Sequence, residues 1–291
     1  MYSKILIPLD GSKFAEAVLP YARVLARQLR IPVDLLYVHD PQEPPAFAPF
    51  MANQYLTGIG ESFGGAVGSI VETGHTAATI VEVAAAQPES LIAMATHGYS
   101  GAKRWLLGSV AEKVLRAAAN HLLLVRPANG EPRAEAKLTT VLVPLDGSKL
   151  AESVLPTVSE LALRLTLRVE LVRVTRRIYS APPEAFLPVF GANAPNLKKL
   201  WEEAHAEANG YLIEKADQLR QQGLTRVESV VLESGADGAA AAIVDLVNKT
   251  PESLVALCTL GESGIGTWPL GSVTERVVRY TTAPVLVIRP R

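Results

Sequence analysis

The chain has 291 residues, long enough for two domains that each bury a core. Its 28 lysine and arginine residues nearly balance 29 aspartate and glutamate residues, and the formal net charge is −1. This balance excludes the strong positive field of a nonspecific nucleic-acid-binding protein. No apolar run reaches the about 18 residues of a membrane span, so we expect neither nucleic acid nor a membrane as a partner.

Two features favour the cytoplasm. The apolar stretch at residues 5–9 ends at Asp10, too early for the core of a signal peptide. The single cysteine, Cys258, permits no internal disulfide. Because it ends a predicted buried strand, we expect a small core residue there rather than a nucleophile.

The sequence contains an internal repeat. Residues 8–13 read PLDGSK and recur as residues 144–149, while LGSV at residues 107–110 recurs at residues 270–273. A repeat of this length predicts duplicated domains. We place domain 1 at residues 1–128 and domain 2 at residues 138–291.

Each repeat begins with an alternation of strand and helix. In the first repeat, a strand at residues 5–7 precedes apolar residues at helical spacing from Ala15 to Leu29. Pro20 lies inside this helix and predicts a kink or a late start, because proline removes a backbone donor and crowds the preceding turn. A second strand follows at residues 33–38.

The repeats then diverge. In the second repeat, residues 197–219 place apolar side chains on one face of a long helix. Residues 40–71 of the first repeat instead contain a proline cluster and five glycines between residues 58 and 68, a composition that disfavours a long helix. We therefore expect domain 1 to have lost this helix, and its uncovered apolar surface to be buried by the other domain or by a partner.

Both repeats close in the same order. A short strand ends at Gly74 or Gly235, an alanine-rich helix and a buried strand follow, and a last helix and strand complete the unit. This alternation predicts an α/β fold with a parallel sheet and helices on both faces. Ligands of such sheets bind at the carboxyl ends of the strands, where the strand order reverses. We expect Asp10 and Gly98 at that point.

A glycine-containing loop carries the clearest functional signal. Gly98 is followed by nine residues and then by Gly108, Ser109 and Val110 at the start of a helix. Glycine lets backbone N–H groups approach an oxyanion, and the first helical turn adds unpaired donors, so the pattern predicts a phosphate ligand. The counterparts in the second repeat are Gly261, Gly271, Ser272 and Val273.

A purely structural interpretation of these loops stays open. Ser109 with Glu112, and Ser272 with Glu275, have the spacing of a capping box, which would simply begin a helix. Capping and phosphate binding are compatible with each other.

Asp10 and Asp146 end the first strand of their repeats. A carboxylate there can accept hydrogen bonds from ribose hydroxyls. The Asp-Gly-Ser sequence is equally typical of a turn with a helix cap. Neither aspartate is paired with a nucleophile or base, so we predict no catalytic residue.

The remaining candidates concern the first loop. His97 is the one histidine placed to touch a ligand, although a packing role is the common alternative. Lys103 and Arg104 are suited either to phosphate charge or to the solvent. The second repeat lacks both cations and has Leu260 in place of His97, which predicts weaker phosphate binding. No Walker-type loop and no metal-ligand spacing of histidines occurs, so we predict neither a P-loop NTPase nor a metal site.

Together these motifs, with MATHG at residues 94–98 and VRP at residues 125–127, resemble the universal stress protein family, specifically its tandem members. The resemblance implies two tandem Rossmann-like α/β sandwiches of the adenine nucleotide alpha hydrolase-like type, each with a mostly parallel five-stranded sheet. One branch of that family binds ATP or AMP and another binds no nucleotide. The loop motif of the binding branch occurs here in both repeats.

The resemblance also implies the residues of each site. The first site comprises Pro8, Asp10, Val38, Ala95, His97, Gly98, Gly108, Ser109 and Val110. The second site comprises Pro144, Asp146, Val174, Gly261, Gly271, Ser272 and Val273. The family motif has a further glycine where this chain has Ala95 and Cys258. Because the cysteine is the larger replacement, the second site is expected to be the weaker one.

Pairing through the last strands is a further implication, with residues 122–125 and 285–288 joining the domains about a pseudo-twofold axis. A homodimer of chains and unidentified protein partners are also expected. Mg²⁺ is expected only as a companion of ATP, because no carboxylate cage is visible. The function expected is that of a cytoplasmic stress-response regulator that binds an adenine nucleotide. The alternatives are a dimerisation scaffold without nucleotide and a slow ATPase.

Overall fold

The computed structural model describes residues 1–42, 49–97, 107–127, 135–176, 197–259 and 271–290. Their strands form one ten-stranded sheet in the order β3-β2-β1-β4-β5-β10-β9-β6-β7-β8. The strands of the first half are β1 (Lys4–Leu9), β2 (Val33–His39), β3 (Val67–Thr73), β4 (Ser90–Ala95) and β5 (Leu122–Val125). Those of the second half are β6 (Thr140–Pro144), β7 (Arg168–Arg176), β8 (Val227–Ser234), β9 (Ser253–Cys258) and β10 (Val285–Ile288).

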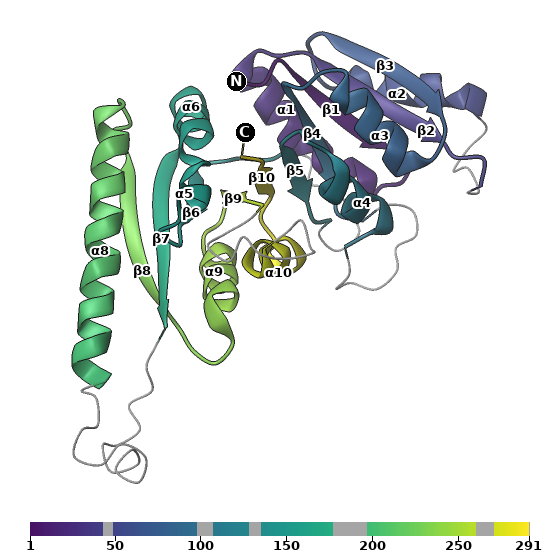
Figure 1. Ribbon diagram of the computed structural model, residues 1–291. Helices are drawn as coiled ribbons and strands as arrows, with labels where there is room; N and C mark the ends of the chain where they lie inside the picture. The colour runs from purple at the N-terminus through teal and green to yellow at the C-terminus, as the bar shows by residue number, and fades with distance from the viewer. Residues whose placement is uncertain (43–48, 98–106, 128–134, 177–196, 260–270, 291) are drawn as a thin grey trace.

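Helices cover both faces of this sheet (Figure 1). One face carries the 3-10 helix η1 (Ala15–Val18), α1 (Leu19–Leu29), α2 (Ala52–Gly60, after the 3-10 turn Pro49–Met51), α5 (Lys149–Glu152), α6 (Leu155–Leu165) and α8 (Leu197–Gln221). The other face carries α3 (Thr76–Ala85), α4 (Ser109–Ala117), α9 (Gly238–Lys249) and α10 (Ser272–Tyr280).

The pleat of the strands divides the core into two layers. Ile5 and Ile7 of β1 pack into one hydrophobic cluster and Leu6 into the other, because successive side chains of a strand point to opposite faces. A strand buried on both faces needs a continuous apolar run, as the sequence of β1 has. Within each half all neighbouring strands are parallel, which confirms the predicted α/β fold.

The predicted effect of Pro20 is confirmed as a late start. Residues Ala15–Val18 form a 3-10 helix, and the α-helix begins at Leu19, so Pro20 lies in its first turn. The N–H that proline lacks would have no intrahelical partner there, and its fixed φ suits the helix. The helix ends at Leu29, and the next residue, Arg30, adopts a left-handed φ of 56°.

The prediction that domain 1 has lost a helix was wrong. α2 packs against β2 and β3, as α8 packs against β7 and β8. The pair Tyr55-Leu56 of α2 corresponds to Tyr211-Leu212 of α8, and both leucines are fully buried. Domain 1 therefore retains a short version of the helix. The glycines lower the intrinsic stability of this helix, and burial of Ala52 and Leu56 against the core offsets that cost.

The short helix also covers the surface that was expected to be exposed. Ala52, Leu56 and Phe63 are buried against the core of domain 1. The chain itself therefore covers this surface, which was expected to need the other domain or a partner.

The two halves join through their last strands, as predicted. β5 and β10 pair antiparallel, with Leu124 opposite Val285, Leu123 opposite Leu286 and Leu122 opposite Val287. The strand order is the same outward from this seam on both sides. An antiparallel seam with that order has a pseudo-twofold axis perpendicular to the sheet, so the carboxyl ends of the two halves lie at opposite edges.

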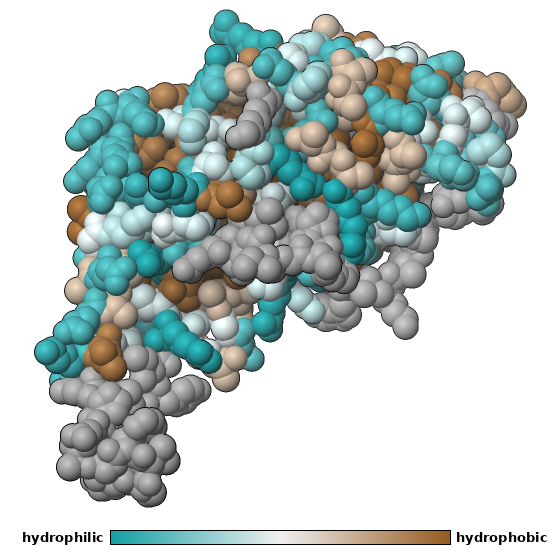
Figure 2. Space-filling view, in the orientation of Figure 1, coloured by the Kyte–Doolittle hydropathy of each residue, from teal (hydrophilic) through white to brown (hydrophobic). Residues whose placement is uncertain are grey.

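Among the described residues, no helix is both long enough and apolar enough to cross a bilayer. The longest of them, α8, is rich in charged side chains. The space-filling view shows mainly hydrophilic residues along its outer side, at the left of the molecule (Figure 2).

Truncation of Leu56 tests whether α2 is part of the core. We expect Leu56→Ala to lower the free energy of unfolding by about 2–5 kcal/mol, since it leaves a cavity under a fully buried leucine. Urea denaturation measures this loss. The matched control is Phe50→Ala, just before the same helix, because Phe50 is 83% exposed and its loss should change the stability by less than about 0.5 kcal/mol. Equal effects of the two substitutions would contradict the assignment.

Candidate functional site

Each half of the sheet has a point where the strand order reverses. In the first half, β2 lies on one side of β1 and β4 on the other. The segments after β1 and β4 diverge to opposite faces at this point, which leaves room for a ligand at the carboxyl ends of the strands. Asp10 follows β1 and Thr96 follows β4, while Asp146 and Thr259 hold the equivalent positions in the second half.

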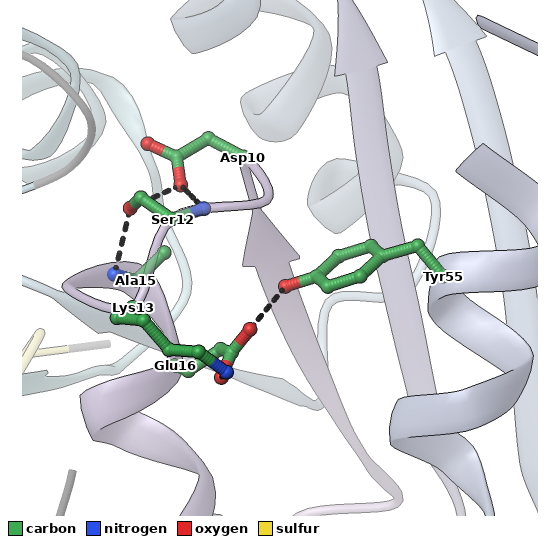
Figure 3. Close-up of polar contacts among 6 residues, drawn as sticks. All are labelled: Asp10, Ser12, Lys13, Ala15, Glu16 and Tyr55. Atoms are coloured by element: carbon green, nitrogen blue, oxygen red, sulfur yellow. Dashed lines mark hydrogen bonds and ion pairs between the residues drawn. The ribbon is translucent and has the colours of Figure 1, made fainter. Parts of the chain in front are cut away.

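The aspartate after the first strand organises a tight turn (Figure 3). Asp10 Oδ1 accepts hydrogen bonds from the Ser12 N–H at 2.9 Å and from Ser12 Oγ at 2.6 Å. Asp146 Oδ1 accepts the same two bonds from Ser148, also at 2.9 and 2.6 Å. The glycine between them has a φ of 83° in the first half and 91° in the second, a region that favours glycine. The turn interpretation is therefore confirmed, and the turn fixes where each carboxylate lies.

A buried glutamate ties this turn to the helix behind it. Glu16 accepts a hydrogen bond from Tyr55 Oη at 3.2 Å and pairs with Lys13 at 2.8 Å (Figure 3). In the second half, Tyr211 donates to Glu152 at 2.9 Å. Burial, and after it the charge of Glu16, raises the pKa of Tyr55, so the phenol stays protonated and remains a donor.

This tyrosine–glutamate contact was missed in the sequence. A signal for it was present, because a glutamate follows PLDGSK at the same place in both repeats and a Tyr-Leu pair occurs in both helices. The unequal lengths of α2 and α8 hid the match.

The predicted capping boxes are wrong. The residue before a helix that can cap it has extended φ and ψ, and here that residue is glycine: Gly108 at −61° and 147°, and Gly271 at −65° and 149°. Ser109 is already the first helical residue, and no side chain caps either helix. Glu112 instead pairs with Arg116 within α4, at 2.6 Å.

The capping glycines approach a neighbouring strand closely. The Gly108 N–H donates to the carbonyl of Thr96 at 2.8 Å, and a Cβ on Gly108 would lie 3.0 Å from that same oxygen. The Gly271 N–H donates to Thr259 O at 2.7 Å. Each helix therefore starts directly above the end of a central strand, with the N–H groups of its first turn directed to the carboxyl edge of the sheet.

A cavity of about 300 Å³ lies at this edge of the second half. It has the size of a small ligand pocket. Of the predicted second-site residues it gathers Pro144, Asp146, Val174, Gly271, Ser272 and Val273. Gly261 lies outside the described residues. Cys258 also lines the cavity. The hydroxyl of Thr274, in the first turn of α10, donates a hydrogen bond to the backbone carbonyl of Cys258 at 2.8 Å.

The first site has the same framework. Pro8 lies in β1, Val38 in β2 and Ala95 at the end of β4, while Ser109 and Val110 begin α4. His97 lies two residues after β4, and its Nδ1 is 3.0 Å from Thr96 Oγ1. Gly98, Lys103 and Arg104 fall outside the part of the chain that the structure describes.

The surroundings of the two sites differ in charge. Tyr37 of β2 has Arg173 of β7 as its counterpart, since the strand registers coincide. Burial and the nearby Asp10 carboxylate raise the pKa of Tyr37. In the second half the Arg173 guanidinium lies 4.8 Å from the centre of the Tyr211 ring, and a Cβ on Gly147 would be 3.3 Å from its Nη2. The turn of the second site thus lies against a cation where the first has a phenol.

The surroundings of the first site also include Asp40, which directly follows β2. Its carboxylate accepts hydrogen bonds from the Gln42 N–H at 3.0 Å and the Thr76 N–H at 3.3 Å, the latter at the start of α3. The Gln42 bond is the main cause that holds the pKa of Asp40 below its ordinary value, against an opposing effect of burial; Thr76 and His75 contribute further.

Acid titration tests this role of Asp40. A lowered pKa in the folded state means that the carboxylate adds stability above its unfolded pKa of about 4, and that this stability is lost as the pH falls through the folded value. We expect Asp40→Asn to be less stable than the wild type at pH 6, and the difference to shrink below pH about 4. Urea midpoints across this range measure it. A difference that is independent of pH would refute the role.

Comparison with known proteins identifies the family. The sequence profile described as the universal stress protein family matches residues 1–126 and 137–289. A universal stress protein of Mycolicibacterium smegmatis is 22% identical over 99% of this chain and 97% of its own length. One of Methanocaldococcus jannaschii is 29% identical over 43% of this chain and 83% of its own length.

A solved structure shows the same fold over the full length. The universal stress protein of Archaeoglobus fulgidus superimposes with a TM-score of 0.68 at 17% identity and covers 100% of both chains. The two matched segments correspond to the two halves of the sheet that β5 and β10 join. The chain belongs to the universal stress protein family and is a tandem member with two such domains.

Proposed function

We propose that this protein is a cytoplasmic regulator that binds an adenine nucleotide, ATP or AMP, at the carboxyl ends of the strands. The observation that carries the proposal is the cavity of the second half. It places an aspartate turn opposite a helix whose first turn has a glycine cap and no capping side chain. The first half has the same aspartate turn, at Asp10, and the same glycine before its helix, at Gly108.

Phosphate suits the glycine starts for two physical reasons. The first N–H groups of a helix have no intrahelical partner, and the aligned peptide dipoles give that end a partial positive charge. A serine cap would have consumed one of these donors, but Gly108 and Gly271 leave the place without a side chain. Hydroxyls of the flanking Ser109 and Ser272 can add further donors.

The nucleoside suits the rest of the cavity. Val174, Ile243 and Leu257 give it apolar walls for a base, and Asp146 gives it an acceptor for ribose hydroxyls. Mg²⁺ would accompany the phosphates of ATP, as hard oxygen ligands dictate. A change in nucleotide occupancy then alters which proteins bind to this chain. A second copy of the chain, in a homodimer, is one such protein.

Calorimetric titration of the ligand-free protein with ATP, AMP and GTP tests the proposal. We expect binding that is selective for adenine and that is lost from the first site in Gly108→Val, because the new side chain would collide with the Thr96 carbonyl. The control is Gly58→Ala, a glycine substitution that meets open space and should leave binding unchanged. A folded wild-type protein that binds none of the three nucleotides would leave the scaffold alternative.

Hydrolysis is decided by a separate readout. We predict that phosphate release from bound ATP stays at the uncatalysed level, since catalysis needs a base placed beside the attacking group and the sequence indicates none. Release that is lost in Asp10→Ala while ATP binding is retained would favour the ATPase alternative.

Cys258 provides the test for the second site. We expect Cys258→Ala to strengthen ATP binding there, because the thiol occupies space in the cavity wall where the first half has Ala95. The measurement is the second-site affinity in a Gly108→Val background. Unchanged or weaker binding would show that the thiol does not limit the site.

A further inference from the structure

Two arginines cross the seam between the halves in a reciprocal manner. Arg126 follows β5, and its Nη1 donates at 2.9 Å to the carbonyl of Arg279 in the last turn of α10. Arg289 follows β10, and its Nη2 donates to the carbonyl of Leu115 in the last turn of α4. Each arginine therefore holds the end of a helix that belongs to the other half.

These two helices are the ones that begin at the proposed phosphate sites. The last carbonyls of a helix lack intrahelical partners and carry partial negative charge, so a guanidinium is a favourable partner there. Phosphate at the first turn and a cation at the last turn both complement the same helix dipole. Arg126 is thus placed to support the second site, and Arg289 the first.

Each arginine is in turn fixed to the site of its own half. The Thr96 N–H donates to Val125 O at 2.8 Å, and the Thr96 carbonyl accepts from Gly108 at the start of α4. In the second half, Thr259 donates to Ile288 O at 3.2 Å and accepts from Gly271. Each arginine therefore directly follows a strand end that is hydrogen-bonded, through a threonine, to the turn proposed to bind phosphate.

These contacts form a closed ring. In the first half, hydrogen bonds connect Gly108 through Thr96 to the end of β5, and Arg126, the next residue, binds the last turn of α10. In the second half, Gly271 at the start of α10 is connected in the same way to the end of β10, and Arg289, the next residue, binds the last turn of α4. Burial lowers the pKa of Arg289, and the charge of the guanidinium is retained because an arginine pKa stays far above neutral pH.

We propose that Arg126 and Arg289 are positioning residues for nucleotide binding that act across the seam, each on the site of the opposite half. This inference rests on the proposed function. Neither arginine touches the nucleotide; each holds the end of the helix that receives the phosphates and complements the dipole of that helix.

The test uses chains with one working site. Gly108→Val leaves the second site, and Gly271→Val leaves the first. In the Gly108→Val background we expect Arg126→Met to weaken ATP binding by about two- to fivefold, and Arg289→Met to have little effect. In the Gly271→Val background the two arginines should exchange roles. Calorimetry measures the affinities, and circular dichroism checks that each variant is folded.

Two controls separate positioning from a general loss of structure. Adenosine lacks phosphate, so its affinity should not change in either arginine variant. Arg126→Lys and Arg289→Lys should each keep part of the ATP affinity that the methionine variants lose, because lysine also donates to carbonyls at helix ends. Arg164→Met removes an arginine that pairs with Glu160 on its own helix, and it should alter neither site.

The outcomes are distinct. A wild-type protein that binds no ATP would overturn the proposed function together with this inference. ATP binding by the wild type with unchanged affinities in the arginine variants would overturn the inference alone. Equal losses for ATP and adenosine, or a loss confined to the site of the arginine's own half, would also overturn it.

Discussion

The structure depends on the backbone hydrogen bonds between β5 and β10. An isolated parallel five-stranded sheet would leave a last strand with unpaired N–H and C=O groups, which is a template for aggregation. Here each half supplies the edge that the other needs, through Leu122–Val125 and Val285–Ile288. Leu123 and Leu286 face each other at this seam and are almost fully buried, so the core continues from one half into the other. The reversed orientation of the two candidate sites follows from this antiparallel pairing.

Much of the fold was predictable because the repeat gave each element twice. The PLDGSK and LGSV matches aligned the beginning and end of the halves, and the apolar runs between them have the period of buried strands and amphipathic helices. Pro20 predicted a kink or a late helix start because proline acts locally through its missing N–H, and the structure has the late start. The α2 helix was missed since local composition disfavours helix there, whereas burial of Leu56 under the sheet stabilises it. Tertiary packing outweighs propensity in a helix this short.

The candidate site was less predictable than the fold. Residue types identified Asp10 and Gly108, but the choice between a serine cap and a glycine cap depends on backbone angles, and a shift of one residue exchanges them. Contacts such as Tyr55 with Glu16, or Arg126 with the end of α10, join segments far apart in the chain. No periodicity in a single sequence reports them.

The seam has a consequence for how the two sites can differ. Three residue pairs join β5 to β10, and Arg126 and Arg289 add hydrogen bonds across the seam. Two separate chains would hold such a contact only at adequate concentration. In a tandem chain the covalent connection raises the effective concentration of one half around the other. The two halves can then differ in sequence and still pair with each other. Two such differences lie at equivalent positions of the halves: Tyr37 in the first corresponds to Arg173 in the second, and Ala95 corresponds to Cys258. Because one chain carries both halves, the duplication always pairs two unlike domains in a one-to-one ratio.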